Sequence, residues 1–295
     1  MRIVTLLPST TEILFALGAG DDVVGVTFEC DHPPEAREKR VVSTSAMPDG
    51  LGPAEIDAWV TSAMRAGEDL YHLDEGALAG LDADLVVTQD LCAVCAVDVS
   101  VVDDALAHLG CTAEVLTIDP HTLEQVLDSV LVLGRATGRG QAATALVDSL
   151  HQRLAAVAAR VAAATGPPPR VLLLEWTEPP FAPGHWVPEM ISLAGGVSSV
   201  GRAGEKSVRI TWEQALDSRP DLVVAAPCGF HLDDSARLAG DLLSAGRLPA
   251  GLPVWAVDAN ASWARPGPRL VNGIEALAAI VAGREPDPQA ARRVS

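Results

Sequence analysis

Four of the five cysteines each come a few residues after an apolar, β-branched run of the sequence: Cys30, Cys92, Cys95 and Cys228. Cys92 and Cys95 form a C-x-x-C pair. Four thiolates are the ligand set of tetrahedral zinc or of an iron–sulfur cluster. In the plainer alternative, small cysteines fill the interiors of loops. Cys111 instead follows Leu-Gly at a predicted helix-to-strand turn, and we expect it to be a structural thiol.

Aromatic side chains gather in loops of the second half of the chain. The sequence has only six Trp, four Phe and one Tyr. Five of these lie at the end of a predicted strand or in the loop after one: Trp176, Phe181, Trp186, Phe230 and Trp263. Aromatic loops with a few polar anchors suit a large, flat, mostly apolar ligand. The alternative for Trp176 and Trp186 is packing in a core.

Polar side chains that could anchor such a ligand lie in the same kind of loop. The expected anchors are Asp90, Glu175, Arg265 and Arg269, and His185 is expected to contact the ligand from the aromatic loop that holds Phe181 and Trp186. A structural salt bridge explains Arg269 equally well.

The hydroxyl run of Ser9, Thr10 and Thr11 follows the first strand. At a helix N-terminus these groups could bind an anion. Helix capping alone also explains them, because Ser9 and Glu12 have the spacing of a capping box.

The elements that position these residues alternate between strands and helices. Nearly continuous apolar runs are typical of strands buried on both faces of a parallel sheet. They predict strands over residues 2–7, 23–28, 84–89, 114–118, 170–176, 221–226 and 254–257. Helical spacing predicts helices over residues 9–17, 120–133, 141–164, 188–193, 212–216 and 268–282. We expect the polar tail, 284–295, to be loose.

The order of these elements predicts an α/β protein of two Rossmann-like lobes joined by a long backbone helix. The lobes are expected over residues 1–119 and 167–295, with the helical connector over 120–166. Ligands of such lobes bind at the carboxyl ends of the strands. All four strand-end cysteines should therefore face a ligand cleft between the lobes.

Charge and motifs exclude several classes of function. The formal net charge is −18, the wrong sign for nucleic acid or for an anionic membrane surface. The sequence has no G-x-S-x-G, P-loop or G-x-G-x-x-G motif, so we expect a binding protein rather than an enzyme.

The N-terminal residues read as a strand and a helix rather than as a secretory signal, and Glu12 interrupts the apolar run. No later run has about 18 uncharged apolar residues, so no membrane insertion is expected. We therefore predict a cytoplasmic protein, a monomer, with thiols or metal ligands rather than disulfides.

Three segments carry a resemblance to a known family: Arg2-Ile-Val-Thr-Leu-Leu-Pro-Ser-Thr-Thr-Glu12, Pro220-Asp-Leu-Val-Val224 and Pro266-Gly-Pro-Arg-Leu-Val-Asn-Gly273. The chain resembles the substrate-binding proteins of cobalamin and iron-siderophore ABC transporters, and is most similar to the cobalamin-binding subgroup. The resemblance extends over essentially the full length, including the connector.

The resemblance implies a corrinoid of the vitamin B12 type as the ligand and an ABC transporter permease as a partner. Such proteins dock through an acidic side chain on each lobe, and Glu189 and Asp98 could stand in those places. It also adds a third possibility for the loops, in which one thiolate, His32 or His231 coordinates the cobalt of a bound corrinoid.

Overall fold

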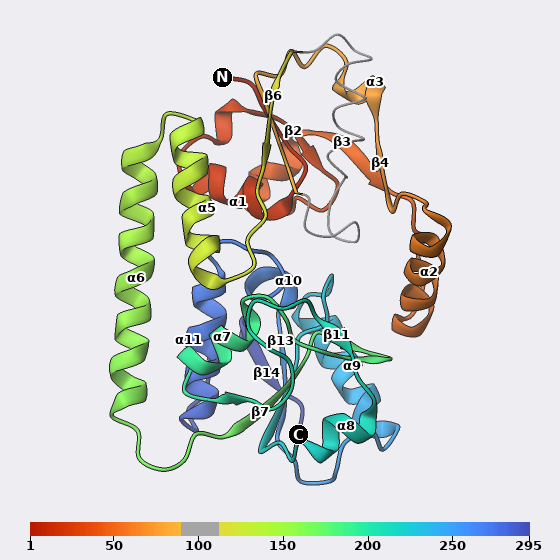
Figure 1. Ribbon diagram of the computed structural model, residues 1–295, viewed down its shortest axis with the longest axis vertical. Helices are drawn as coiled ribbons and strands as arrows, with labels where there is room; N and C mark the ends of the chain where they lie inside the picture. The colour runs from red at the N-terminus through yellow and green to blue at the C-terminus, as the bar shows by residue number, and fades with distance from the viewer. Residues whose placement is uncertain (90–111) are drawn as a thin grey trace. The chain divides into compact units, whose positions relative to one another are not determined.

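The computed structural model describes residues 1–89 and 112–295, which divide into two compact units (Figure 1). Unit 1 comprises Met1–Pro120 and Leu127–Val147, and unit 2 comprises His121–Val126 and Asp148–Ser295. Both units are built on a sheet with helices packed against it, which confirms the predicted α/β class. Each unit is described by itself.

The sheet of unit 1 has six strands in the order β4-β3-β2-β1-β5-β6. All neighbours pair in parallel except β3 and β4. The strands are β1 (Ile3–Thr5), β2 (Val23–Thr27), β3 (Arg40–Ser45), β4 (Tyr71–Leu73), β5 (Leu85–Thr88) and β6 (Glu114–Thr117). The four strands predicted from apolar runs are present. β3 and β4 were not predicted, because β3 is half exposed and polar and β4 has only three residues.

The helices and turns of this part of the chain are α1 (Pro8–Ala16), η1 (Gly20–Asp22), η2 (Pro34–Glu38), α2 (Pro53–Ala66), α3 (Glu75–Leu78), α5 (Leu123–Ala136) and α6 (Gly140–Ala162). The division between the two units falls within α5 and within α6. Both helices agree with the helical runs predicted for the connector.

The predicted capping box at the start of α1 is wrong. The N-cap is Leu7, Pro8 occupies the first turn, and no side chain caps the helix. The fixed φ of proline is already suited to the first helical position. The hydroxyls of Thr10 and Thr11 instead donate to the Leu7 carbonyl oxygen, at 3.0 and 3.1 Å.

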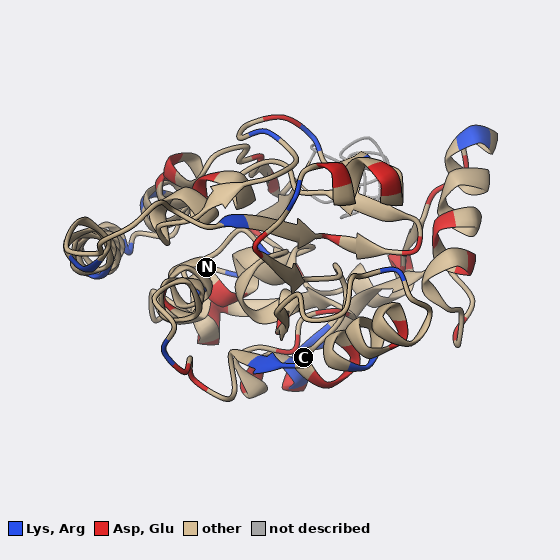
Figure 2. Ribbon diagram, turned by 90° about the horizontal axis from the view of Figure 1, so that it is seen from below, with Lys and Arg blue, Asp and Glu red and all other residues tan. Residues whose placement is uncertain are grey.

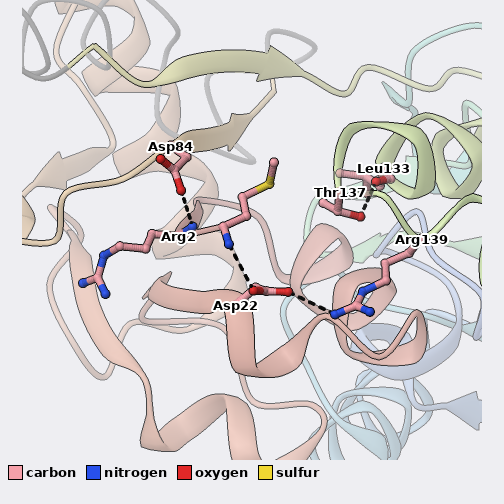
Figure 3. A network of polar contacts seen from close by, with 7 residues as sticks. Arg2, Asp22, Asp84, Leu133, Thr137 and Arg139 are labelled. Carbon is pink, nitrogen blue, oxygen red and sulfur yellow. Dashed lines mark hydrogen bonds and ion pairs between the residues drawn. The ribbon is translucent and has the colours of Figure 1, made fainter.

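Polar contacts join the turn between α5 and α6 to the rest of unit 1 (Figure 3). Asp22 accepts from the N-terminal ammonium at 3.4 Å and from Arg139 at 3.3 Å. The backbone N–H of Arg2 donates to Asp84 at 2.7 Å. These side chains are partly exposed, so each ion pair contributes only about 0–1 kcal/mol.

The main sheet of unit 2 has five strands in the order β10-β7-β12-β13-β14. They are β7 (Arg170–Leu174), β10 (Val197–Ser198), β12 (Leu222–Ala225), β13 (Val254–Val257) and β14 (Ala291–Arg293). A smaller antiparallel sheet, ordered β11-β9-β8, contains β8 (Trp176–Thr177), β9 (Pro180–Ala182) and β11 (Val208–Arg209). Its helices are α7 (Val187–Leu193), α8 (Trp212–Asp217), α9 (Leu232–Ser244), α10 (Ala259–Ser262) and α11 (Leu270–Val281).

The central strand β7 is buried on both faces. Val171 and Leu173 belong to one core cluster, and Leu172 and Leu174 belong to another. Successive side chains of a strand point to opposite faces of the sheet. This explains why the predicted strands here are continuous apolar runs.

The prediction of a loose C-terminal tail is wrong. β14 pairs antiparallel with β13, with Val257 opposite Ala291 and Trp255 opposite Arg293. Ala291 is buried, and the Val294 N–H donates to the Val254 carbonyl at 2.8 Å. The backbone groups of β13 would otherwise form an open sheet edge, and β14 satisfies them.

Acidic residues lie on many helices and loops of both units (Figure 2), in keeping with the formal net charge of −18. Across residues 1–89 and 112–295, none of the helices is both long and apolar enough to cross a bilayer.

Candidate functional site

The carboxyl ends of three neighbouring strands in unit 2 carry most of the predicted binding residues. β12 pairs in parallel with both β7 and β13, so the segments that follow these strands start at one edge of the sheet. We call residues 175–186, 226–231 and 258–265 the carboxyl-edge loops. The Cys228 N–H donates to the Glu175 carbonyl at 3.0 Å, and the Asn260 N–H donates to the Phe230 carbonyl at 3.2 Å. These bonds join the three loops to one another.

Trp176 and Phe230 form an aromatic pair across two of these loops. Their ring centroids lie 5.7 Å apart and their planes are inclined by 46°. Both side chains are half-buried. The indole N–H of Trp176 donates to the Glu178 carbonyl at 3.2 Å, which fixes the orientation of the ring. Two of the residues predicted to contact a ligand are thus brought together, with part of their surface exposed.

His231 and Asp258 form a polar contact beside the aromatic pair. The His231 Nδ1 lies 3.2 Å from both carboxylate oxygens of Asp258. Asp258 also caps α10, because its Oδ1 accepts from the Ala261 N–H at 2.8 Å. The His231 side chain is 53% exposed. Asp258 was not predicted as a site residue, although Asp before a short helical run is a recognisable N-cap signal.

Trp186 and Trp263 lie in the core of unit 2. They are 5% and 2% exposed, and the Trp186 Nε1 donates to the Trp263 carbonyl at 2.8 Å. A Cβ on Gly273 of α11 would lie 3.1 Å from the Trp263 ring, so this ring is closely packed against α11. Their burial favours the packing alternative that the sequence left open for Trp186.

His185 and Arg265 are both half-buried. His185 has a positive φ of 49°, and its N–H donates to the Glu205 carbonyl at 2.6 Å. Its ring lies 5.8 Å from the ring of His121 and 5.6 Å from that of Trp186. His185 therefore packs against aromatic neighbours within unit 2, whereas Arg265 follows Trp263 in the third carboxyl-edge loop.

Two of the four cysteines predicted to bind a metal lie in the described part of the chain. Cys30 is in unit 1, 4% exposed, with its Sγ 3.0 Å from the Thr11 hydroxyl. Cys228 is exposed in unit 2. Within residues 1–89 and 112–295, no three His, Cys, Asp or Glu side chains are grouped to hold a metal ion. Four further predicted residues lie outside the described ranges, together with Asp98: Asp90, Cys92, Cys95 and Cys111.

The carboxyl group of Glu175 has partners within its own unit. Its Oε1 accepts from the Gly184 N–H at 3.1 Å, and its Oε2 accepts from the Ser207 hydroxyl. Burial raises the pKa of Glu175 from 4.5 to about 7, and the two hydrogen bonds oppose that rise only in part.

Glu189, near the start of α7, caps another helix. Its Oε2 accepts from the Leu123 N–H at the start of α5, at 2.8 Å. A carboxylate at a helix N-terminus is stabilised by the unpaired N–H groups there. Docking of a transporter through Glu189 remains a prediction.

This chain matches a family model and relatives that are named as binding proteins. A family model described as periplasmic binding protein matches residues 3–241. A vitamin B12-binding protein of Vibrio cholerae serotype O1 is 26% identical over 283 residues, covering 93% of this chain and 86% of the relative. An uncharacterized ABC transporter substrate-binding lipoprotein of Bacillus subtilis is 26% identical over 284 residues, covering 94% of this chain and 78% of the relative.

A solved structure shows the same fold. The periplasmic heme binding protein from Pseudomonas aeruginosa superposes with a TM-score of 0.74 at 22% identity, covering 100% of this chain and 98% of the other. This likeness and the family match confirm the predicted fold class and the family resemblance.

The predicted cytoplasmic location is wrong. The matched family is one of periplasmic binding proteins, and the Bacillus subtilis relative is a lipoprotein. The prediction depended on the character of the first residues, which form β1 and the start of α1 and carry no information on the compartment.

Proposed function

We propose that this chain, which belongs to the periplasmic binding protein family, binds a corrinoid and delivers it to an ABC transporter. The observation that carries the proposal is the half-buried aromatic pair at the carboxyl edge of unit 2. The vitamin B12-binding relative supports the choice of ligand, and the substrate-binding lipoprotein supports the role in transport.

Corrinoids have a broad, mostly apolar macrocycle with polar amide groups around its rim. Trp176 and Phe230 offer apolar ring surface to the macrocycle, and aromatic rings bury a large area at low entropic cost. Arg265, half-buried in the third carboxyl-edge loop, is proposed as a polar anchor. This combination of apolar surface and few polar groups is typical of small-molecule sites.

Charge favours a corrinoid over heme. Heme has two propionate carboxylates, whereas cyanocobalamin has no net charge and cobinamides are not anionic. The formal net charge of this chain is −18, and long-range repulsion slows the approach of anionic ligands. We therefore expect a preference for corrinoids that grows as the ionic strength falls.

The ligand is tested by calorimetric titration of the purified protein with cyanocobalamin, dicyanocobinamide and hemin. One equivalent of a corrinoid should bind with micromolar or tighter affinity, and hemin should bind more weakly. Trp176→Ala should weaken corrinoid binding about tenfold, which corresponds to about 1.4 kcal/mol. Trp212→Phe on α8, outside the carboxyl-edge loops, is the control and should leave the affinity unchanged.

Absence of corrinoid binding at micromolar concentrations would refute the proposal. Tighter binding of hemin than of either corrinoid would refute the choice of ligand.

A further inference from the structure

Glu175 joins two segments of unit 2 that are far apart in sequence. It directly follows β7, and its carboxyl group accepts from the Gly184 N–H at 3.1 Å and from the Ser207 hydroxyl. Gly184 comes just after β9, and Ser207 comes just before β11. One carboxyl group therefore holds together the end of β9 and the beginning of its antiparallel neighbour.

The backbones of these two segments touch each other at this point. A Cβ on Gly184 would lie 2.3 Å from the Ser207 nitrogen and 2.6 Å from the Glu205 oxygen, so only glycine fits. Nearby, the His185 N–H donates to the Glu205 carbonyl at 2.6 Å, and the Gly204 N–H donates to the His185 carbonyl at 2.9 Å. We call residues 183–185 and 204–207 the crossing.

Glu175 is also linked to the aromatic pair through its backbone. Its N–H donates to the Phe181 carbonyl at 3.2 Å, and its carbonyl accepts from the Cys228 N–H at 3.0 Å. The next residue is Trp176, and Phe230 follows Cys228 by two positions. These two bonds connect the Glu175 backbone to the loops that carry both rings of the aromatic pair.

The carboxyl group has no cationic partner among the described residues. The charged side chains near Glu175 and Ser207 in sequence have other contacts or are exposed. Glu178 pairs with Arg247 at 3.5 Å, and Arg202 pairs with Glu205 at 3.6 Å. Arg209 lies over the Phe181 ring, and Lys206 is exposed. The other titratable groups on the adjoining loops are His185, Cys228, His231 and Asp258. A buried carboxylate without a counter-ion is costly. In keeping with this, burial raises the pKa of Glu175 to about 7.

We propose that Glu175 is a proton-controlled positioning residue for the aromatic pair, whose neutral carboxyl keeps the crossing closed and whose ionisation favours its opening. The effect on ligand affinity rests on the proposed function, whereas the opening itself does not. The sign follows from linkage. Opening hydrates the carboxyl group and returns its pKa toward 4.5, so the open state loses the proton more readily than the closed state. A rise in pH through about 7 therefore shifts the population toward the open crossing.

Hydrogen exchange on the ligand-free protein tests the proposal at pH 6 and pH 8, after correction for the intrinsic dependence of exchange on pH. Peptides covering residues 176–185 and 204–209 should lose about tenfold in protection at pH 8, if opening hydrates the carboxyl group fully. Glu175→Gln should show equal protection at both values. The control is Glu205→Gln, an exposed carboxylate on the same segment, which should keep the pH dependence.

Ser207→Ala provides a second test of the proposal if Glu175→Gln fails to fold. The Ser207 hydrogen bond lowers the pKa of Glu175, so Ser207→Ala should move the midpoint of the exchange transition to higher pH. Equal pH dependence in the wild type and Glu175→Gln, or an unmoved midpoint in Ser207→Ala, would overturn the proposal.

Affinity for cyanocobalamin is measured on the same variants. The wild type should bind up to about tenfold more weakly at pH 8 than at pH 6, and Glu175→Gln should bind equally at both. If exchange depends on pH as expected but no corrinoid binds, the positioning role stands and the proposed function fails. If a corrinoid binds and the pH dependence of exchange does not depend on Glu175, the proposed function stands and the positioning role fails.

Discussion

The hydroxyl cluster at the carboxyl edge of the unit 1 sheet and the aromatic pair at the carboxyl edge of the unit 2 sheet differ in their exposure. In unit 1, the buried side chains of Thr5, Thr10, Thr11 and Cys30 form hydrogen bonds with one another. The Thr5 and Thr10 hydroxyl oxygens lie 2.6 Å apart, and the Thr11 hydroxyl oxygen lies 3.0 Å from the Cys30 Sγ. In unit 2, the aromatic pair and His231 keep exposed surface. Short hydroxyls can satisfy one another within a turn, whereas large rings and ionisable groups at a sheet edge cannot all be enclosed. The hydroxyl cluster of unit 1 is thus enclosed, whereas the aromatic pair and His231 of unit 2 stay partly accessible.

The largest effect that we predict separates the tryptophans of unit 2 into packing and binding residues. Trp263→Ala removes a buried ring from the core and should lower the free energy of unfolding by about 4 kcal/mol. Trp176→Ala removes a half-buried ring and should cost clearly less. Urea denaturation monitored by circular dichroism measures both, and equal losses would contradict the distinction.

A smaller effect is predicted for the hydroxyl cluster of unit 1. Thr5→Val keeps the shape of the side chain but removes the group that bonds to Thr10, Thr11 and the Leu7 carbonyl. Loss of a buried hydrogen-bonding partner should cost about 2 kcal/mol of unfolding free energy. Thr44→Val, at an exposed position of β3, is the matched control and should cost almost nothing. A neutral Thr5→Val would show that the closed network does not stabilise unit 1.

The smallest effect concerns the polar contact at the edge of unit 2. Asp258→Ala removes the cap of α10 and should cost about 1 kcal/mol. His231→Ala should cost less than about 0.5 kcal/mol, because the side chain is largely exposed. Thermal denaturation of both variants measures the difference. A larger loss of stability for His231→Ala than for Asp258→Ala would contradict this and show that His231 stabilises the fold although its side chain is exposed.

Much of the fold was predictable from the sequence because buried parallel strands must be apolar on both faces. This holds for β7, β12 and β13 in unit 2. It fails for β14 (Ala291–Arg293), which has two exposed arginines, lacks an apolar run and pairs antiparallel with β13. α9 lies outside the predicted helices, although Leu238 and Leu242 are one helical turn apart among charged residues.

The candidate site was predictable to a lesser extent. The positions of Trp176 and Phe230 near the ends of neighbouring strands were predictable, because they depend only on the topology, and their contact with a ligand stays a prediction. The sequence could not distinguish the half-buried Trp176 from the buried Trp263, since Trp is equally suited to a core. The partners of Glu175 were beyond prediction, because Ser207 is 32 residues away in sequence.

The central claim is that the carboxyl edge of unit 2 binds the ligand, whereas the hydroxyl cluster of unit 1 only stabilises its unit. Calorimetric affinity for cyanocobalamin, compared between Phe230→Ala and Thr5→Val, tests this most directly. We predict about tenfold weaker binding for Phe230→Ala, about 1.4 kcal/mol, and wild-type affinity for folded Thr5→Val. Wild-type affinity in Phe230→Ala, together with lost binding in a folded Thr5→Val, would contradict the account.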